Sequence, residues 1–537
     1  MSVAEDNGGK PNGGKHGCWD SAKSSKIMAR DMTSSLHAVA TGIFCACFLL
    51  VTLAGFWAAR WKRGDLNSLE EWGLAGRRFG TLVTWFLIGG DFYTAYTVIA
   101  VPAALYGTGA PGFFAIPYCI LLYPYMMLVL PRLWQVCHRH GYVTLADFVR
   151  GRFGSRLLSI AIALTGILAT MPYIALQLVG MREVIAALGI HGEWPLIAAF
   201  VILAAYTYSS GLRAPAVIAI VKDIMLYIMV LAAIIIIPMK LGGYAHVFYA
   251  ASTALAQKKP PASIILQPSQ YLSYTTLAFG SAIAIVLYPH TATGVLSSSS
   301  GTVIKRNAAL LPAYNLLLAL IALLGFVALA AGIHTANTSS AVPLLFVQEF
   351  PEWFAGFCLA AIGIGALVPA AIMSIASANL FTRNLYGELV HRSMTPKQEA
   401  TQAKMVSLFI KIGALVFVLF VRAQYAIELQ LLGGIWIAQL FPSVVCGLFS
   451  RWFHGRALFC GWLVGMATGT GMALARDLKS SIYPLHLGSH VWMVYAAIPA
   501  LIVNLLVSVV VTLLLDALKR ERGRDTTLES DYVAEQA

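Results

Sequence analysis

The sequence predicts an all-α polytopic membrane protein with thirteen transmembrane helices. Of its 537 residues, 58% are hydrophobic and only 11% are charged, whereas a soluble domain has about 25% charged residues. The mean hydropathy is +0.74. Apolar stretches long enough to cross a hydrocarbon core of roughly 30 Å recur from residue 37 to residue 516. A membrane barrel would instead show short alternating strands.

The predicted spans lie between charged or Gly- and Pro-rich breaks. They cover residues 37–59, 80–106, 111–130, 157–180, 193–209, 214–239, 272–300, 308–332, 353–382, 403–422, 427–449, 457–475 and 490–516. This divides the chain into a disordered head (1–36), a transmembrane domain (37–516) with core spans over 80–449, and a tail (517–537). The loops leave no room for an appended kinase or hydrolase domain.

The loop charges predict the orientation of the chain. The loops on one side, together with the tail, hold 23 Lys and Arg residues, against 12 in the other loops and the head. Positive loops face the cytoplasm, so the C-terminus is predicted to be cytoplasmic and the head periplasmic, in a bacterial inner membrane. The net charge of +13 follows from this bias, and no nucleic-acid partner is expected.

Asp91 is the first charged residue predicted to lie inside the membrane. It follows Gly89 and Gly90 and lies about 16 Å into the second span, where Pro102 further weakens the helix. An interrupted helix exposes carbonyl and amide groups that bind a cation and an anionic substrate. The alternative is an aspartate that only satisfies the broken backbone.

Lys222 and Asp223 form a second buried charged pair, about 13 Å beyond Arg213 along the sixth span. Adjacent side chains on a helix point about 100° apart, so we expect each of the two to need a partner elsewhere. Since buried charges are expensive in lipid, the pair is a functional candidate. A purely structural ion pair with another helix is the alternative.

Lys411 and His290 are weaker candidates. Lys411 lies close enough to cytoplasmic Lys404 that we expect its side chain to reach the membrane surface. His290 follows a proline in the middle of the seventh span, where its ring could bind substrate or carry a proton. A hydrogen-bonded core histidine is an equal alternative.

Four segments resemble the sodium:solute symporter family and occur in its order. They are VTLADFVRGRFGSRLLS (143–159), YIALQLVGM (173–181), YPH (288–290) and FTRNLYGE (381–388). The resemblance implies a five-plus-five inverted-repeat core with its site between the broken second and seventh helices. Two further segments, GALVPAAIMSIASANLFTRNLY and LQLLGGIWIAQLFP, look most like bacterial monocarboxylate permeases, which import lactate, pyruvate and sometimes alanine.

The resemblance also implies candidate cation ligands. Asp91 matches an aspartate that serves the sodium site in the proline-transporting members, with the backbone oxygens of Gly89 and Phe92 as neighbouring ligands. Asp223 matches an acidic residue that several members use near a second cation site.

The ninth span departs from the family pattern. Where sodium-coupled members have two hydroxyl residues, this chain has Val368 and Pro369, which offer no oxygen ligand. Ser374 and Ser377 lie one and two turns further on and compensate only if the helix is shifted. Lys222 lies in the helix that borders this site, so we hypothesise that its ammonium replaces sodium and that its protonation couples uptake to H+.

The second hypothesis concerns the substrate. Its carboxylate is expected to dock at the amide-rich break near Gly89 and Gly90, where helix dipoles favour an anion. Side-chain contacts are expected from Tyr93, Thr94, Gln177 and His290.

The sequence therefore predicts a secondary symporter that imports small monocarboxylates, with H+ and Na+ both open as the coupling ion. The alternatives are a sodium-coupled symporter for proline-like amino acids or another organic solute, and, from a different class, a membrane sensor or channel. An enzyme is not expected, because no nucleophile with a base and no metal cluster is visible. We expect no cofactor, and as partners only a small organic anion, the lipid bilayer and, at most, weak self-association.

Overall fold

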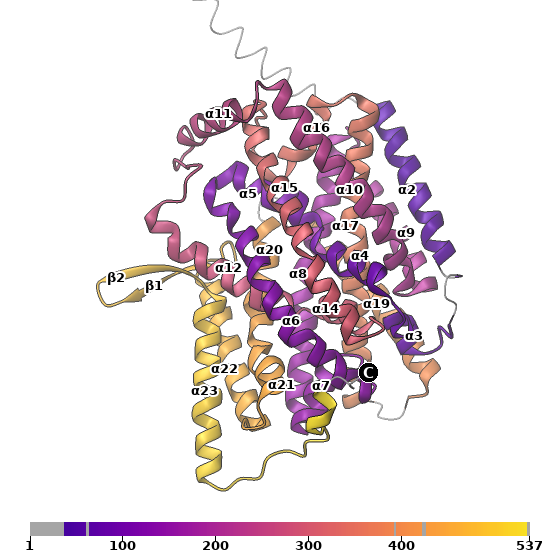
Figure 1. Ribbon diagram of the computed structural model, residues 1–537, viewed down its shortest axis with the longest axis vertical. Helices are drawn as coiled ribbons and strands as arrows, with labels where there is room; N and C mark the ends of the chain where they lie inside the picture. The colour runs from indigo at the N-terminus through magenta and orange to yellow at the C-terminus, as the bar shows by residue number, and fades with distance from the viewer. Residues whose placement is uncertain (1–36, 59, 61–63, 391–393, 421–425, 534–537) are drawn as a thin grey trace, which may run out of the picture.

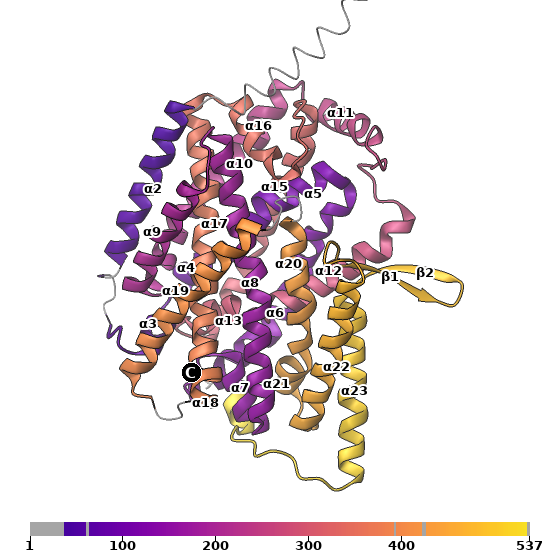
Figure 2. The same cartoon turned by 180° about the vertical axis from the view of Figure 1, so that it is seen from behind.

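The computed structural model describes residues 37–58, 60, 64–390, 394–420 and 426–533. The head predicted to be disordered (1–36) lies outside the described residues. The described chain is mainly a bundle of tilted helices, from which one two-stranded hairpin projects sideways (Figures 1 and 2).

The long apolar helices form the body of the bundle. They are α2 (Ala38–Ala58), α6 (Ala115–Arg139), α8 (Arg156–Ala187), α10 (Arg213–Lys240), α15 (Pro312–Ala330), α17 (Glu352–Leu380), α19 (Pro396–Phe420), α22 (Gly455–Leu474) and α23 (Ala497–Ala517).

Shorter helices complete or connect these long ones. They are α3 (Leu69–Leu74), α4 (Thr81–Phe92), η2 (Tyr96–Ala100), α5 (Val101–Thr108), α7 (Leu145–Phe153), α9 (Trp194–Ser210), α11 (Tyr244–Ala256), α12 (Tyr271–Ile285), α13 (Pro289–Leu296), α14 (Gly301–Leu310), α16 (Ala341–Glu349), η6 (Phe381–Tyr386), α20 (Ala426–Ile437) and η10 (Glu529–Tyr532).

Within the described residues, ten helices are long and apolar enough to cross a membrane, and the bent pair α12–α13 makes eleven. Three shorter apolar helices, over Thr81–Gly90, Tyr96–Thr108 and Trp194–Ser210, correspond to the predicted second and fifth spans. The chain is therefore a multi-pass membrane protein. Its outer surface agrees, because large apolar side chains such as Leu128 and Leu513 are more than half exposed.

Helix α17 is the centre of the bundle. Every residue of its most apolar stretch is buried, whereas only 22% and 28% of the corresponding stretches of α2 and α23 are buried. It packs against α2, α8, α10 and α19. The polar side chains of α17 and of its neighbours therefore lie in the interior, where they can serve a transport path.

The predicted second span is broken, as expected. Helix α4 ends at Phe92, and regular helix resumes at Tyr96. The amides freed by the break find side-chain acceptors: Ala95 N donates to Gln177 Oε1 (2.9 Å) and Tyr96 N donates to Thr94 Oγ1 (3.0 Å). Side-chain capping of this kind stabilises a helix start inside the membrane.

The predicted seventh span is broken as well. Helices α12 and α13 meet at 48°, and Tyr288 between them has an extended conformation. Pro289 begins α13, because proline lacks the N–H that an unbroken helix would use and fits the first helical turn.

The prediction of an all-α chain is wrong in one place. The last predicted span starts at residue 490, but β1 (Ile482–Leu487) and β2 (His490–Tyr495) pair as an antiparallel hairpin, and α23 starts only at Ala497. The segment HVWMVY is rich in the β-branched and aromatic residues that favour strands. Gly488 has a φ of +61°, which suits the tight turn.

The tail folds back onto the bundle. Asp525 Oδ2 lies 2.6 Å from Arg152 Nη1 of α7, and Asp531 Oδ2 lies 2.8 Å from His140 Nε2 beyond the end of α6. Tyr532 is buried beneath the guanidinium groups of Arg132 and Arg152. These contacts hold the tail against the segment that connects α6 to α8.

Candidate functional site

Lys222 of α10 reaches the break between α4 and η2. Its side chain is fully buried, and its Nζ donates to Gly90 O (2.6 Å) and to Tyr93 O (2.9 Å). The same Nζ lies 3.0 Å from Asp223 Oδ1. Lys222 therefore has partners on another helix, as expected, but it also meets Asp223, which the angle of about 100° between adjacent side chains did not predict. The four methylenes of lysine let its ammonium turn back toward the carboxylate beside the same break.

Asp223 is held from a second helix. Its Oδ2 accepts a hydrogen bond of 2.6 Å from the hydroxyl of Tyr314 in α15. The ammonium donates to two backbone carbonyls, and Asp223 Oδ1, which accepts no hydrogen bond among the described residues, lies beside the ammonium as its counter-charge. A buried pair survives desolvation only with additional bonds of this kind, so this site is an ion pair supported from three helices.

Two glycines of α4 make room for this arrangement. A Cβ on Gly89 would lie 2.3 Å from the ring of Tyr314, and a Cβ on Gly90 would lie 3.0 Å from Lys222 Nζ. The absence of side chains at these two glycines therefore allows α10 and α15 to approach the break. This steric role is separate from any effect of the glycines on the continuity of the helix.

Two of the predicted sodium ligands, the backbone oxygens of Gly89 and Phe92, accept hydrogen bonds from within the chain. Gly89 O accepts a bond from Tyr93 N (3.3 Å) and Phe92 O accepts one from the Thr97 hydroxyl. The side chain of Asp91 lies outside the described part of the chain. Val368 and Pro369 are buried in α17 without any side-chain oxygen. The carbonyls of Gly90 and Tyr93 at the break accept hydrogen bonds from the ammonium of Lys222.

Ser374 and Ser377 belong to a different cluster. Ser374 Oγ donates to Ala371 O (2.8 Å) and accepts from Ser407 Oγ of α19 (3.3 Å). Ser377 Oγ is buried without a hydrogen-bond partner among the described residues. No hydrogen bond between described residues connects either serine to Lys222.

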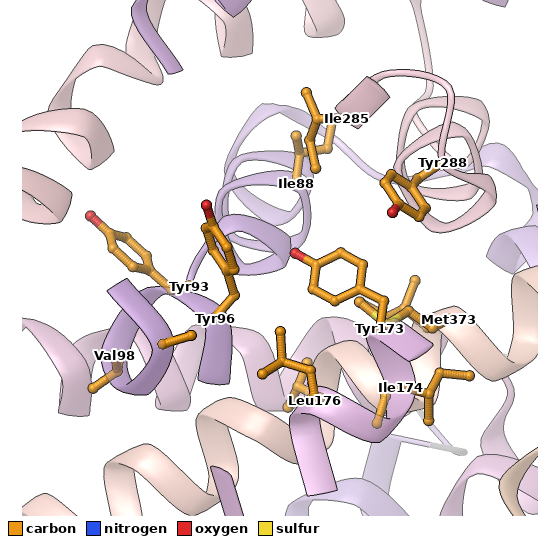
Figure 3. Packing of buried hydrophobic residues seen from close by; sticks show 14 of the residues in the cluster. Ile88, Tyr93, Tyr96, Val98, Tyr173, Ile174, Leu176, Ile285, Tyr288 and Met373 are labelled. Atoms are coloured by element: carbon orange, nitrogen blue, oxygen red, sulfur yellow. The ribbon is translucent and has the colours of Figure 1, made fainter. Parts of the chain in front are cut away.

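A cluster of aromatic rings lies where the two broken helices meet α8. Tyr173 of α8 lies 5.4 Å from the ring of Tyr288 and 5.3 Å from that of His290, both at the break between α12 and α13. Figure 3 shows Tyr96, from the other break, beside Tyr173, with the Tyr173 hydroxyl directed toward it. His290 is 1% exposed, so its ring is part of this buried cluster.

The other predicted substrate contacts are mostly engaged elsewhere. Gln177 and Thr94 cap the amides of the break, as described above. The Tyr93 hydroxyl donates to Tyr314 O, and Figure 3 shows its ring turned away from Tyr173. Of the predicted side chains, His290 alone lies in the aromatic cluster.

Sequence reasoning missed Tyr96, Tyr173 and Tyr288. The Tyr96 hydroxyl is buried and has no hydrogen-bond partner among the described residues. Tyr173 and Tyr288 stand in two of the segments that carry the family resemblance. A tyrosine inside such a segment, next to a helix break, was the available signal.

The two remaining resembling segments meet at the C-terminal end of α17. Asp147 of α7 lies 2.9 Å from Arg383 Nε and accepts a bond of 2.7 Å from Asn384 Nδ2. Asn384 Oδ1 in turn accepts from the Thr144 hydroxyl (2.7 Å). These residues close the end of the bundle between α7 and η6.

The C-terminal end of α8 is hydrogen-bonded to the segment between α15 and α16. Glu183 Oε2 accepts bonds from Asn337 Nδ2 (2.8 Å) and from the Ser340 hydroxyl (2.5 Å), both between α15 and α16. The aromatic cluster thus lies between two polar closures, one at each end of the bundle.

Comparisons with known proteins agree with this architecture. The sodium:solute symporter family profile matches residues 72–469. The sequence is 52% identical over 490 residues to the monocarboxylate transport permease protein of Rhizobium johnstonii, with 90% of this chain and 99% of that protein covered. It is 35% identical over 427 residues to the uncharacterized symporter YodF of Bacillus subtilis, with 78% and 84% covered.

A solved structure has the same fold. It is a Na+-coupled sialic acid symporter in a substrate-bound outward-open state, with a TM-score of 0.72 and 15% sequence identity. The alignment covers 89% of this chain and 98% of that chain. These similar proteins are transporters and not enzymes.

Proposed function

Because the chain belongs to the sodium:solute symporter family, we propose that it is a secondary active symporter that imports small monocarboxylates together with H+. Lactate and pyruvate are the proposed substrates, with alanine as a further one. The single observation that carries the coupling to H+ is the ammonium of Lys222 on the break carbonyls of Gly90 and Tyr93.

The substrate assignment is supported by a relative and by the chemistry of the interior. The relative with 52% identity is named a monocarboxylate transport permease. In this chain, His290 and the hydroxyls of Tyr96 and Tyr173 provide polar groups next to the two breaks, and the surrounding rings exclude water. A small carboxylate needs a few such polar contacts within an apolar site.

The coupling step follows from the contacts of Lys222. The protonated amine donates to two break carbonyls and attracts Asp223, so it holds α4, α10 and α15 in one arrangement. Loss of the proton removes one N–H and the whole charge, which weakens all of these contacts together. In the proposed cycle, Lys222 takes up a proton from outside with the substrate and releases it to the cytoplasm.

The family core and orientation complete the proposal. The breaks at 93–95 and 286–288 interrupt the second and seventh predicted spans, which are the first spans of the two proposed five-helix halves, and this supports thirteen spans with a five-plus-five inverted repeat. The loop charges support a cytoplasmic C-terminus and a periplasmic head in the inner membrane of a bacterium.

Uptake by purified protein in proteoliposomes tests the proposal. Radiolabelled lactate should accumulate under an inward proton gradient without sodium, and a protonophore should abolish this accumulation. Uptake that requires a sodium gradient and ignores a proton gradient would overturn the coupling.

Competition tests the substrate class in the same vesicles. Pyruvate should compete with lactate, and proline should not. If proline alone competes, the chain is an amino-acid symporter. Uptake that does not saturate and does not depend on a gradient would identify a channel.

A further inference from the structure

Lys411 is a second lysine buried in the bundle, and it lacks the partners that Lys222 has. It lies about 22 Å along α19 from Pro396 and is 2% exposed. The expectation that its side chain reaches the membrane surface is therefore wrong, because its Nζ instead donates back to Ser407 Oγ, 2.7 Å away on the preceding turn.

The hydroxyl of Ser407 links Lys411 to α17 by hydrogen bonds. Ser407 Oγ donates to Ser374 Oγ (3.3 Å), which donates to Ala371 O (2.8 Å). Among the described residues, no carboxylate lies within 4.0 Å of Lys411 Nζ, and Ser407 is its single hydrogen-bond acceptor. An ammonium in such surroundings is strongly stabilised by an anionic group.

A groove on the membrane-facing side of the bundle leads to Lys411. It has a volume of about 670 Å³ and runs between α9 and α19. Apart from Lys411 and the hydroxyl of Tyr208, its lining is apolar, with Phe200, Leu408 and Leu415 among its walls. Val201 and Ile412 at its edges are more than half exposed, so the groove faces the hydrocarbon region of the bilayer.

We propose that this groove binds a single-chain amphiphile with a carboxylate head, such as a long-chain fatty acid. The acyl chain lies along the apolar walls, and the carboxylate pairs with Lys411 Nζ. A fatty acid enters the hydrocarbon core as the neutral acid. Proton transfer from the acid to an uncharged amine gives a carboxylate and an ammonium as a pair, so no isolated charge crosses the lipid.

The depth of Lys411 distinguishes this ligand from a phospholipid. The phosphate of a phospholipid stays in the headgroup layer, whereas Lys411 lies several turns from the cytoplasmic end of α19. Lys404 lies nearer that end, with its Nζ 5.9 Å from the ring centre of Tyr208. A headgroup at the mouth of the groove would therefore contact Lys404 and not Lys411.

The bound chain would join two helices that flank the centre of the bundle. Helices α9 and α19 pack against each other, and α19 packs along α17. Because Ser407 and Ser374 connect Lys411 to α17 by hydrogen bonds, a change in the contacts of Lys411 also alters the contacts of α17. The ligand is therefore expected to alter the motions of these helices as well as to fill the groove.

Photolabelling of the full chain in nanodiscs of phosphatidylcholine tests the site. The probe is a palmitic acid analogue with a diazirine in its chain, and labelled peptides are mapped by mass spectrometry. Wild type should be labelled on α9 and α19. Excess palmitate should suppress this labelling, and hexadecanol, which has the same chain without the carboxylate, should not.

Variants distinguish the contribution of the Lys411 ammonium to binding from that of the apolar walls. Lys411→Met should lower the affinity for palmitate about tenfold or more, and Lys411→Arg should retain most of it. Lys404→Met is the matched control and should bind like wild type. Size-exclusion profiles and Tm values identify any variant that is misfolded, and in that case the Arg variant and the hexadecanol comparison decide.

Three results would overturn the proposal. Equal suppression by hexadecanol would mean that the groove accepts any alkyl chain. Wild-type affinity in Lys411→Met, with a loss in Lys404→Met, would place the head at the mouth of the groove. Suppression by phosphatidylglycerol as strong as that by palmitate would identify a phospholipid site.

Discussion

The hydroxyl of Tyr314 donates a 2.6 Å hydrogen bond to the carboxylate of Asp223. This contact joins α15 to the buried ion pair of α10, and therefore joins the two proposed halves of the core. Tyr314 also accepts, through its backbone oxygen, the hydroxyl of Tyr93 from the break. A substitution of Tyr314 should therefore alter the structure of the break between α4 and η2.

Tyr314→Phe should lower both stability and uptake. The variant keeps the ring that packs on Gly89 but leaves Asp223 Oδ2 without its donor, which costs about 1.5–3 kcal/mol for a bond to a charged group. The Tm in detergent and lactate uptake in proteoliposomes measure the effect. The control is Tyr227→Phe, whose ring lies 6.1 Å from that of Tyr314. Equal behaviour of the two variants would contradict the role of the hydroxyl.

Lys222→Met should abolish uptake driven by a proton gradient. Methionine fills a similar volume, but the break carbonyls and Asp223 lose their cationic partner, so uptake should fall at least about a hundredfold. The measurement is initial lactate uptake at several external pH values. Lys404→Met, which removes a positive charge outside the buried ion pair, is the control. Full proton-driven uptake in Lys222→Met would count against the coupling scheme.

Gly89→Ala should destabilise the protein. The added Cβ would lie 2.3 Å from Tyr314, and overpacking of this kind costs about 1–3 kcal/mol. Gly471→Ala, in α22, is the matched control, because a Cβ there meets nothing within 4 Å. The comparison of Tm values checks the prediction, and a Gly89→Ala variant as stable as Gly471→Ala would show that the break tolerates a shift of α15.

Tyr96→Phe should discriminate between substrates. The Tyr96 hydroxyl is available to bind the 2-hydroxyl or 2-keto oxygen of a substrate, so its loss should raise the KM for lactate about tenfold. Acetate has no such oxygen, and its inhibition constant should change little. Tyr118→Phe serves as control, because its ring packs 6.5 Å from that of Tyr96. Equal losses for lactate and acetate would indicate a packing role.

The docked tail should depend on the charge of Asp531. Burial raises the pKa of this carboxyl, but the amide of Leu528 and the side chains of His140 and Arg139 more than offset this, and the pKa is lowered. A lowered pKa in the folded state means that the contribution is complete above the unfolded value of about 3.9. It is lost as the pH falls below that value.

Wild type should therefore keep its tail docked throughout the neutral range, and Asp531→Asn should release it there. Trypsin cleavage at Arg520, Arg522 and Arg524, followed at neutral pH, measures the release. Asp477→Asn, at an exposed position, is the control. Equal cleavage rates in Asp531→Asn and wild type would show that the other contacts suffice.

The helix breaks could be predicted from the sequence, whereas the contacts that the broken segments make with other helices could not. Gly89 and Gly90 lie in the last turn before the first break, and Pro289 begins the helix after the second, so a local signal for both breaks is present in the chain itself. The bond between Ala95 and Gln177 joins residues far apart in the sequence and depends on how α4 packs on α8. The spacing of Lys222 and Asp223 on a helix indicated separate partners, because helical geometry fixes Cβ positions and not the end of a long flexible side chain.

The hairpin before α23 shows a second limit. Residues 490–495 contain no Lys, Arg, Asp or Glu and run directly into the apolar stretch that follows, and they were therefore assigned to the last helix. The β-branched and aromatic content of this segment carried the contrary signal. The aromatic cluster was missed for another reason: tyrosines are frequent in this chain, and only the packing of three helices distinguishes Tyr96 from the rest.

Lys222 differs from a bound sodium ion in that four methylenes tie it to α10. It moves only as far as its side chain reaches, so it never leaves the protein with the substrate. In the proposed cycle, the one charge that crosses with a monocarboxylate anion is a proton, and the two cancel. Membrane voltage would then do no work on uptake, and the steepness of accumulation would be set by the pH difference alone.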